Sequence, residues 1–151
     1  MRVLLATEHD AALTLLRIAL GGVMFAHGAQ KMLGWFGGNG FSGTMGFMTE
    51  QMGIPAVLVL LAIVAEFFGA LGLITGTLTR VAAFGILSVF VVAMFKVHLL
   101  NGFFMNWMGD QQGEGVEYFL LGIPMALALV WRGGGAASVD GWLASRGRAA
   151  I

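Results

Sequence analysis

Four long apolar stretches dominate the sequence, and short polar or glycine-rich segments separate them. The stretches cover residues 11–33, 55–78, 80–100 and 115–131. A helix that crosses a bilayer needs about 20 mainly apolar residues. The first three stretches meet this length, whereas the fourth is short and contains Pro124. The pattern predicts an all-α membrane protein, built as an antiparallel bundle of four transmembrane helices in one domain over residues 1–151.

The segments outside these stretches predict two further short helices. Residues 35–52 mix Gly with Phe and Met, which favours a short helix lying on the membrane surface between the first two spans. The glycines at 133–135 should end the fourth span. In the tail, residues 132–151, we expect Ser138 and Asp140 to cap a short helix that contains Trp142.

The composition agrees with a protein solvated by lipid. Apolar residues make up 58% of the chain, against roughly 45–50% for a soluble domain. Charged residues make up 11%, against roughly 25%. A small soluble protein cannot bury that much apolar surface. The composition therefore excludes a disordered chain, a soluble nucleic-acid binder and an ordinary cytosolic enzyme.

Charge and cysteine content narrow the chemistry further. The formal net charge is zero, so nothing supports a general attraction to nucleic acid. The absence of cysteine excludes disulfides, thiolate zinc sites, Cys-ligated iron–sulfur clusters and covalently attached haem. We expect no metal site and no covalent cofactor.

The distribution of basic residues predicts the orientation. One set of loops and ends carries Arg2, Arg80, Arg132, Arg146 and Arg148, and the other side carries only Lys31 and Lys96. Because basic residues are enriched on the cytoplasmic side, both termini should lie in the cytoplasm. We expect a multi-pass protein of the bacterial inner (plasma) membrane. The first stretch should be retained, since its apolar run is too long for a cleaved signal peptide.

Small residues predict where two helices touch. Ala65, Gly69, Gly72 and Gly76 fall within about 60° of one another at 100° per residue. Such a stripe lets another helix approach closely.

Ionisable residues within the spans are the candidates for function, because each costs about 2.5–3.5 kcal/mol on insertion scales. Arg17, His27 and Lys31 lie within about 80° on one face of the first helix. Glu66 lies roughly 16 Å, and His27 roughly 12 Å, below the outer surface at 1.5 Å per residue. The two depths predict that Glu66 and His27 meet.

A wider polar cluster is expected in the outer half of the bundle: Gln30, Lys31, Lys96, His98, Asn101 and Glu117. Lys96 and His98 are about 200° apart on a helix, so only one of them can face the interior. Our hypothesis assigns Glu66 and His27 as the catalytic pair. It assigns cofactor binding to Lys31, Gln30, His98, Glu117 and Arg17, with protons relayed outward through His98 and Glu117.

Each of these residues also has a structural interpretation. Glu66 could form an ion pair with His27 or Lys31 that only joins helices. Arg17 could reach lipid headgroups or bond the carbonyls at helix ends. His98 could simply form hydrogen bonds at the interface.

The sequence resembles the DoxX family of small four-helix membrane proteins over roughly residues 12–143. The motifs that carry the resemblance are LRIALG at 16–21, HGAQK at 27–31, EFFG at 66–69, GTLTR at 76–80, NGFF at 101–104, GEGVEY at 113–118, RGGG at 132–135 and SVD at 138–140. Relatives often carry His where this chain has Phe119, so we expect no ligand there.

The family takes its name from a subunit of a thiosulfate:quinone oxidoreductase. The resemblance therefore implies an inner-membrane subunit associated with quinone-linked redox chemistry within a larger complex, with quinone as cofactor and other membrane or redox subunits as partners. Three alternatives stay open: a non-catalytic assembly subunit, a small-solute transporter that works as a homo-oligomer, and haem ligation by His27 and His98.

Overall fold

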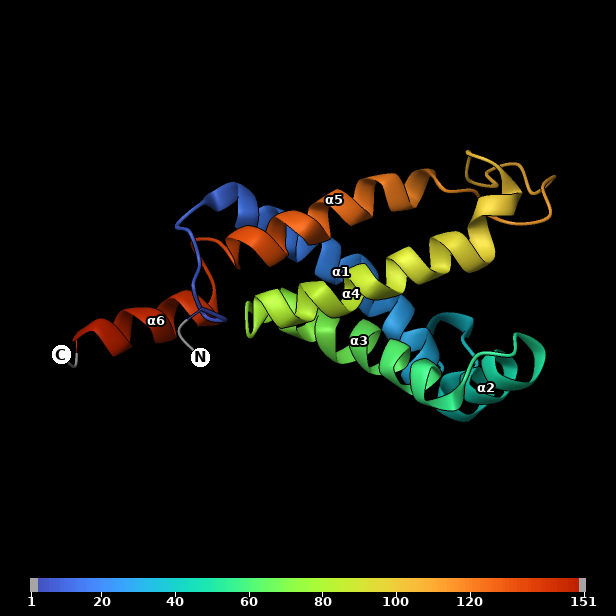
Figure 1. Cartoon of the computed structure of the whole chain (residues 1–151), viewed down its shortest axis with the longest axis horizontal. Helices are drawn as coiled ribbons and strands as arrows, with labels where there is room; N and C mark the ends of the chain where they lie inside the picture. Colours follow the sequence, from blue (N-terminus) through green and yellow to red (C-terminus); the bar gives the residue numbers. More distant parts are fainter. Residues whose placement is uncertain (1–2, 150–151) are drawn as a thin grey trace.

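The computed structural model describes the backbone of residues 3–149 and the side chains of residues 3–146. Within this part of the chain every regular element is helical. Figure 1 shows four long helices running alongside one another, with both ends of the chain at the same end of the molecule. These helices are α1 (Ala11–Leu33), α3 (Ala56–Thr75), α4 (Thr79–Ala93) and α5 (Glu117–Arg132).

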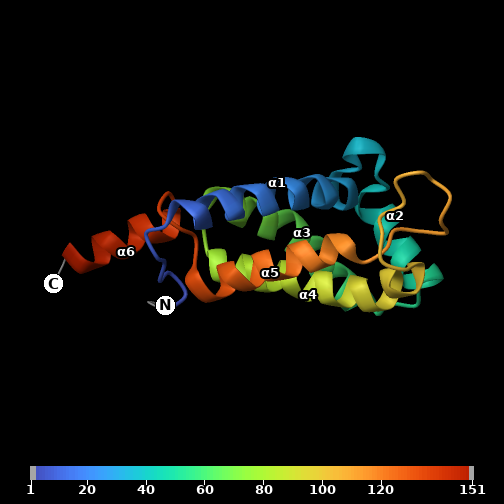
Figure 2. The same ribbon diagram turned by 90° about the horizontal axis from the view of Figure 1, so that it is seen from above.

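The four long helices form a closed ring, in which α1 contacts α3, α3 contacts α4, α4 contacts α5 and α5 contacts α1 (Figure 2). Their inward faces meet in an apolar core that includes Leu20, Ala70, Ile86, Ala126 and Leu129. The outward faces are apolar as well, and large side chains such as Leu15, Phe84 and Leu121 are exposed. Helices that are apolar on every side are typical of a membrane span.

Within the described residues, three helical segments are long and apolar enough to cross a bilayer. They are α1, α3 and residues 79–101, where α4 continues through the π-helical segment η3 (Met94–His98) and the 3₁₀ turn η4 (Leu99–Asn101). The prediction of an all-α membrane protein is therefore confirmed in part: the structure has three candidate membrane-spanning helices among the described residues. Helix α5 has 16 residues and contains Pro124, so it reaches about 24 Å. The fourth crossing stays a prediction.

The predicted helix boundaries agree with the structure where the local sequence indicates a helix start or end. The stretch predicted at 11–33 is α1, and Pro55 directly precedes α3. The tight turn between α3 and α4 uses left-handed backbone at Gly76 (φ 73°) and Leu78 (φ 47°). The side chains of Arg2 and Arg148, used in the orientation prediction, lie outside the part of the chain that the structure describes.

Short helices fill the connection between α1 and α3. Gly34 ends α1 in left-handed conformation. The 3₁₀ turn η1 (Trp35–Gly37), helix α2 (Gly40–Gly46) and the π-helical turn η2 (Phe47–Gln51) follow. The expected short helix within residues 35–52 is confirmed as α2 and η2. Its position on a membrane surface stays a prediction.

The small-residue stripe is a site of close packing, as predicted; Ala65, Gly69 and Gly72 meet α4, whereas Gly76 meets Ser138 and Arg17. A Cβ built on Gly85 of α4 would lie 3.2 Å from Ala65 Cβ, and one built on Gly69 would lie 3.4 Å from the Ala82 carbonyl oxygen. Helices α1 and α3 approach still more closely. A Cβ on Gly28 would lie 2.6 Å from Phe67 Cα and 2.7 Å from the Glu66 carbonyl oxygen, so only glycine fits there.

Candidate functional site

A partly buried ion pair joins α1 to α3 near the end of the ring that lies away from the chain termini. Lys31 Nζ lies 2.6 Å from Glu66 Oε2. The Glu66 residue is only 4% exposed. The close approach at Gly28 places the two helices near enough for this contact. Of the two partners that the sequence left open for Glu66, the structure selects Lys31, which lies one turn beyond His27 on α1.

The ion pair borders a cavity of about 260 Å³ that all four long helices line. Its polar lining comprises His27, Lys31, Glu66, His98, Glu114 and Tyr118. Its apolar walls include Met24, Phe90 and Phe119. His27 thus shares the cavity with Glu66, although no hydrogen bond joins the two among the described residues. The predicted proximity of Glu66 and His27 is therefore confirmed only in that both side chains line the same cavity.

Aromatic side chains shape the cavity on the α4 and α5 side. The Phe90 ring stands edge-on to Tyr118 and to Phe119, with centroids 5.6 and 5.7 Å apart. The His27 ring centroid lies 6.5 Å from that of Tyr118. The Tyr118 hydroxyl faces Met24 Sδ at 3.8 Å. A flat apolar group could therefore lie between these rings and the ion pair.

His98 faces this cavity, whereas Lys96 is exposed on the outside of α4. The expectation that only one of the two can face inward is confirmed. His98 Nδ1 lies 2.8 Å from the Glu114 carbonyl oxygen. Because a carbonyl only accepts, Nδ1 carries the proton, and Nε2 of a neutral ring is the acceptor.

Glu117 and Gln30, both assigned to cofactor binding from the sequence, do not line the cavity. The Glu117 carboxylate accepts hydrogen bonds from the Met105 backbone N–H at 2.8 Å and from Trp107 Nε1 at 3.3 Å. It therefore orders the loop of residues 102–116 at the start of α5. Gln30 Nε2 donates to the Phe36 carbonyl at 3.3 Å, because its side chain is turned toward η1. The sequence missed Glu114, which reaches the cavity through loop folding that no periodicity encodes.

Arg17 lies at the opposite end of the molecule from the cavity and does not line it, and its assignment to the cofactor stays an untested prediction. The residue is 1% exposed. Its guanidinium donates to the carbonyls of Leu73, Ile74, Gly134 and Ala137. The physical reason is the free carbonyls at the carboxyl end of α3, which require donors and favour a cation. The alternative interpretation, bonding of helix-end carbonyls, is confirmed.

The tail helix α6 (Val139–Ala149) begins beside Arg17. Ser138 Oγ accepts from the Gly141 N–H at 3.1 Å, so its predicted capping role is confirmed. Asp140 does not cap α6. Its carboxylate instead accepts from the N–H groups of Leu78 and Thr79, at 2.8 and 2.7 Å, and caps α4.

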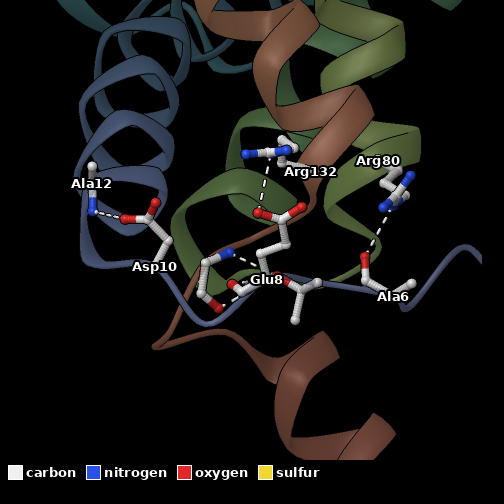
Figure 3. A network of polar contacts seen from close by, with 8 residues as sticks. Ala6, Glu8, Asp10, Ala12, Arg80 and Arg132 are labelled. Atoms are coloured by element: carbon white, nitrogen blue, oxygen red, sulfur yellow. Dashed lines mark hydrogen bonds and ion pairs between the residues drawn. The ribbon is translucent and has the colours of Figure 1, made fainter.

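Further polar contacts tie the N-terminal segment to the same end (Figure 3). Glu8 pairs with Arg132 of α5 at 3.1 Å. Arg80 Nε donates to the Ala6 carbonyl at 2.9 Å, and Asp10 caps α1 by accepting from the Ala12 N–H at 2.7 Å. This end of the molecule is therefore held by structural contacts, and the polar cavity at the other end is the candidate site.

The fold and the site define a class: a protein whose described part is helical, with helices of membrane-spanning length and a partly open cavity with polar residues at one end. The family model for DoxX matches residues 12–99, more than half of the chain, so the chain belongs to the DoxX family. The matched region contains His27, Lys31, Glu66 and His98, whereas the motifs at 101–140 lie beyond it. Searches of curated proteins and of solved structures each gave no match.

Proposed function

We propose that this DoxX protein is an inner-membrane subunit of a quinone-linked redox complex, and that its polar cavity binds the quinone ring. The observation that carries the proposal is one partly open cavity that combines an ion pair, two histidines and aromatic walls. Ligand pockets measure roughly 300–1,000 Å³. A cavity of about 260 Å³ lies just below that range, which suits a single ring better than a large ligand.

The residues fit a quinone ring. Its two carbonyl oxygens are acceptors, and Lys31 and His27 both offer N–H donors toward the cavity. The ring itself is flat and apolar, which suits walls formed by Phe90, Tyr118 and Phe119. When bound, a quinone takes up two electrons and two protons. The chain's own part is to bind and orient the ring, to exclude water and to handle protons.

Glu66 and Lys31 together hold the proton-handling position. The ionised Glu66 fixes the Lys31 ammonium beside the cavity at 2.6 Å. A proton passing from Lys31 Nζ to Glu66 Oε2 neutralises both groups without leaving a buried charge unpaired. His98 and Glu114 line the same space nearer the outer loop. We therefore propose that the Lys31–Glu66 pair exchanges protons with the solvent through His98 and Glu114, instead of through His98 and Glu117.

The electrons come from a partner subunit in this proposal. The chain has no cysteine, so it cannot supply a dithiol or hold a cysteine-ligated cluster. A larger complex is therefore part of the proposal, and a non-catalytic assembly role is the outcome expected if the cavity binds no quinone.

We also propose that α5 completes a fourth crossing, with both termini in the cytoplasm. Helix α5 begins beside the outer end of the α4 segment, since the Glu117 N–H donates to the Phe103 carbonyl at 2.9 Å. It ends at Arg132, at the same end of the molecule as Arg80. The loop of residues 102–116 makes up the length that α5 lacks. Basic residues at that end favour a cytoplasmic location.

Glu66→Gln tests the proposed function. The substitution keeps the shape of the side chain but removes its charge and its proton-accepting capacity. We expect quinone-dependent activity to be lost in native membranes, and a tail-less benzoquinone to bind about tenfold more weakly to purified protein, because one charge-assisted contact is removed. Glu50→Gln, an exposed carboxylate outside the cavity, is the matched control. Unchanged activity and binding in the Glu66 variant, with the protein folded, would overturn the proposal.

A further inference from the structure

A long apolar groove runs along the outward face of α3 and α4. Its volume is about 1,360 Å³. Small residues line it, including Ala65 and Gly85, where the two helices approach each other closely. Phe68 and Phe84, both more than half exposed, are among the larger side chains that border it. Because the small lining residues lack long side chains, the space above them is open to a chain-like molecule.

The groove and the polar cavity share part of their lining. Five residues border both spaces: Lys31, Glu66, Val89, Ala93 and His98. The ion pair and His98 therefore lie where the groove meets the cavity. The groove also borders Leu78 at the other end of α4. From Leu78 to Ala93 is about 22 Å at 1.5 Å per residue, which is most of the hydrocarbon thickness of a bilayer.

We infer that the ligand of the cavity is a membrane-soluble quinone with a long isoprenoid tail, that it enters laterally from the bilayer, and that its tail lies in the groove between α3 and α4. This inference rests on the proposed function, and it adds the substrate class and the route. An occupant of both spaces needs a small polar head and one long apolar chain. A water-soluble quinone would leave the groove unused.

Charge selects this occupant over a phospholipid. Lys31 and Glu66 neutralise each other at the junction of the two spaces. Lys96 borders the groove, and Glu114 borders the cavity. The junction has no excess of positive charge that would select an anionic phosphate, and a neutral ring meets no penalty there. The cavity of about 260 Å³ also holds one ring more readily than a headgroup with two acyl chains.

The groove directs the tail and adds little affinity. Lipid chains are as apolar as the groove walls, so a tail gains no hydrophobic free energy by leaving lipid for protein. Its effect is positional, because a tail held along α3 and α4 orients the ring toward Lys31 and His27. Blocking the groove should therefore exclude the tailed quinone by steric conflict and leave a tail-less ring unaffected.

The test uses purified full-length protein in phosphatidylcholine nanodiscs and two probes. One is a tail-less dimethoxy-methyl benzoquinone, and the other carries the same ring on an isoprenoid tail that ends in a photoreactive diazirine. Ser88→Phe fills the groove from α4. Ser88 is exposed, and its hydroxyl bonds only the Phe84 carbonyl of its own helix among the described residues, at 2.9 Å. Val91→Phe is the matched control on the same helix, exposed and outside both spaces.

We expect Ser88→Phe to weaken binding of the tailed quinone about tenfold, a typical effect of forcing an extra side chain into occupied space. Binding of the tail-less ring should be unchanged, and Val91→Phe should bind both probes as the native protein does. In the native protein, the diazirine should label groove residues of α3 and α4.

Three outcomes would overturn the inference while leaving the proposed function intact, provided that the tail-less ring still binds in a Glu66-dependent way. The tail could label α1 or α5. Ser88→Phe could bind both probes normally. A photoreactive phospholipid or a second copy of the chain could occupy the groove and withstand competition by the tailed quinone. If neither quinone binds the native protein, both proposals fail.

Discussion

Asp140 Oδ2 accepts a hydrogen bond from the backbone N–H of Thr79 at 2.7 Å, although the two residues belong to different helices. Thr79 is the first residue of α4, and no side chain from the turn before it caps the helix. Asp140 also donates its own N–H to the Gly76 carbonyl at 2.9 Å. Asp140 thus both accepts and donates hydrogen bonds at the turn between α3 and α4. These bonds attach α6 to the four-helix ring.

Asp140→Ala should destabilise the protein by about 2–3 kcal/mol, since it removes a helix cap and leaves buried N–H groups without an acceptor. Asp140→Asn should lose less, because its amide oxygen can still accept one of the two bonds. Denaturant unfolding in mild detergent measures the change, and hydrogen exchange at Leu78 and Thr79 locates it. Asp110→Ala, in an exposed loop, is the control and should lie within about 0.5 kcal/mol of the native protein. Equal stability of the Asp140 and Asp110 variants would contradict the capping role.

Arg17→Lys tests whether the geometry of the guanidinium, and not only its charge, holds the same end together. Four carbonyls from α3 and the 133–138 segment accept from Arg17. A lysine ammonium has three donors on one atom and cannot match that spread. We expect a loss of about 1.5–3 kcal/mol in unfolding free energy, as for one or more hydrogen bonds to a charged group.

Arg132→Lys is the matched control for Arg17→Lys. Arg132 is half exposed in its ion pair with Glu8, so its replacement should change stability by less than about 1 kcal/mol. Quinone-ring binding should be the same in both variants, because neither residue borders the cavity. Weaker ring binding in a folded Arg17→Lys protein would support the assignment of Arg17 to the cofactor site.

Substitution by alanine should have opposite effects on protein stability at two glycines of α1. Gly28→Ala places a Cβ within 2.7 Å of the α3 backbone at Glu66 and Phe67, so the helices must separate and the Lys31–Glu66 contact must lengthen. Gly22 has nothing within 4 Å of its Cβ position. Gly22→Ala should therefore stabilise the protein by up to about 1 kcal/mol through helix propensity.

The pair is measured by unfolding free energy and by binding of the tail-less quinone. Gly28→Ala should lower both, whereas Gly22→Ala should raise stability and leave binding unchanged. Should Gly28→Ala keep native stability and binding, the close α1–α3 approach would not be what positions the ion pair.

The sequence predicted the elements that local patterns encode and missed those that depend on distant contacts. The hydrophobic runs and Pro55 predicted where the long helices lie. The stripe through Ala65 predicted a close helix–helix contact, which α3 makes with α4. The sequence left the partner of Glu66 open, because His27 and Lys31 lie one turn apart on the same face of the first helix. Both side chains are therefore at a depth from which they could reach Glu66. The role of Asp140 was missed because its partners lie more than 60 residues away along the chain.

Accessible thiols can decide whether α5 crosses the membrane. The chain has no cysteine, so a single one introduced at Asp110, Ser145 or Thr77, all exposed, reports one segment. Asp110→Cys in the 102–116 loop should react with a membrane-impermeant maleimide in spheroplasts. Ser145→Cys in α6 and Thr77→Cys in the α3–α4 turn should react only after permeabilisation, because Asp140 binds α6 to that turn. If Ser145→Cys and Asp110→Cys both react from outside while Thr77→Cys does not, α5 does not cross. The contact between Asp140 and Thr79 would then not form in the membrane.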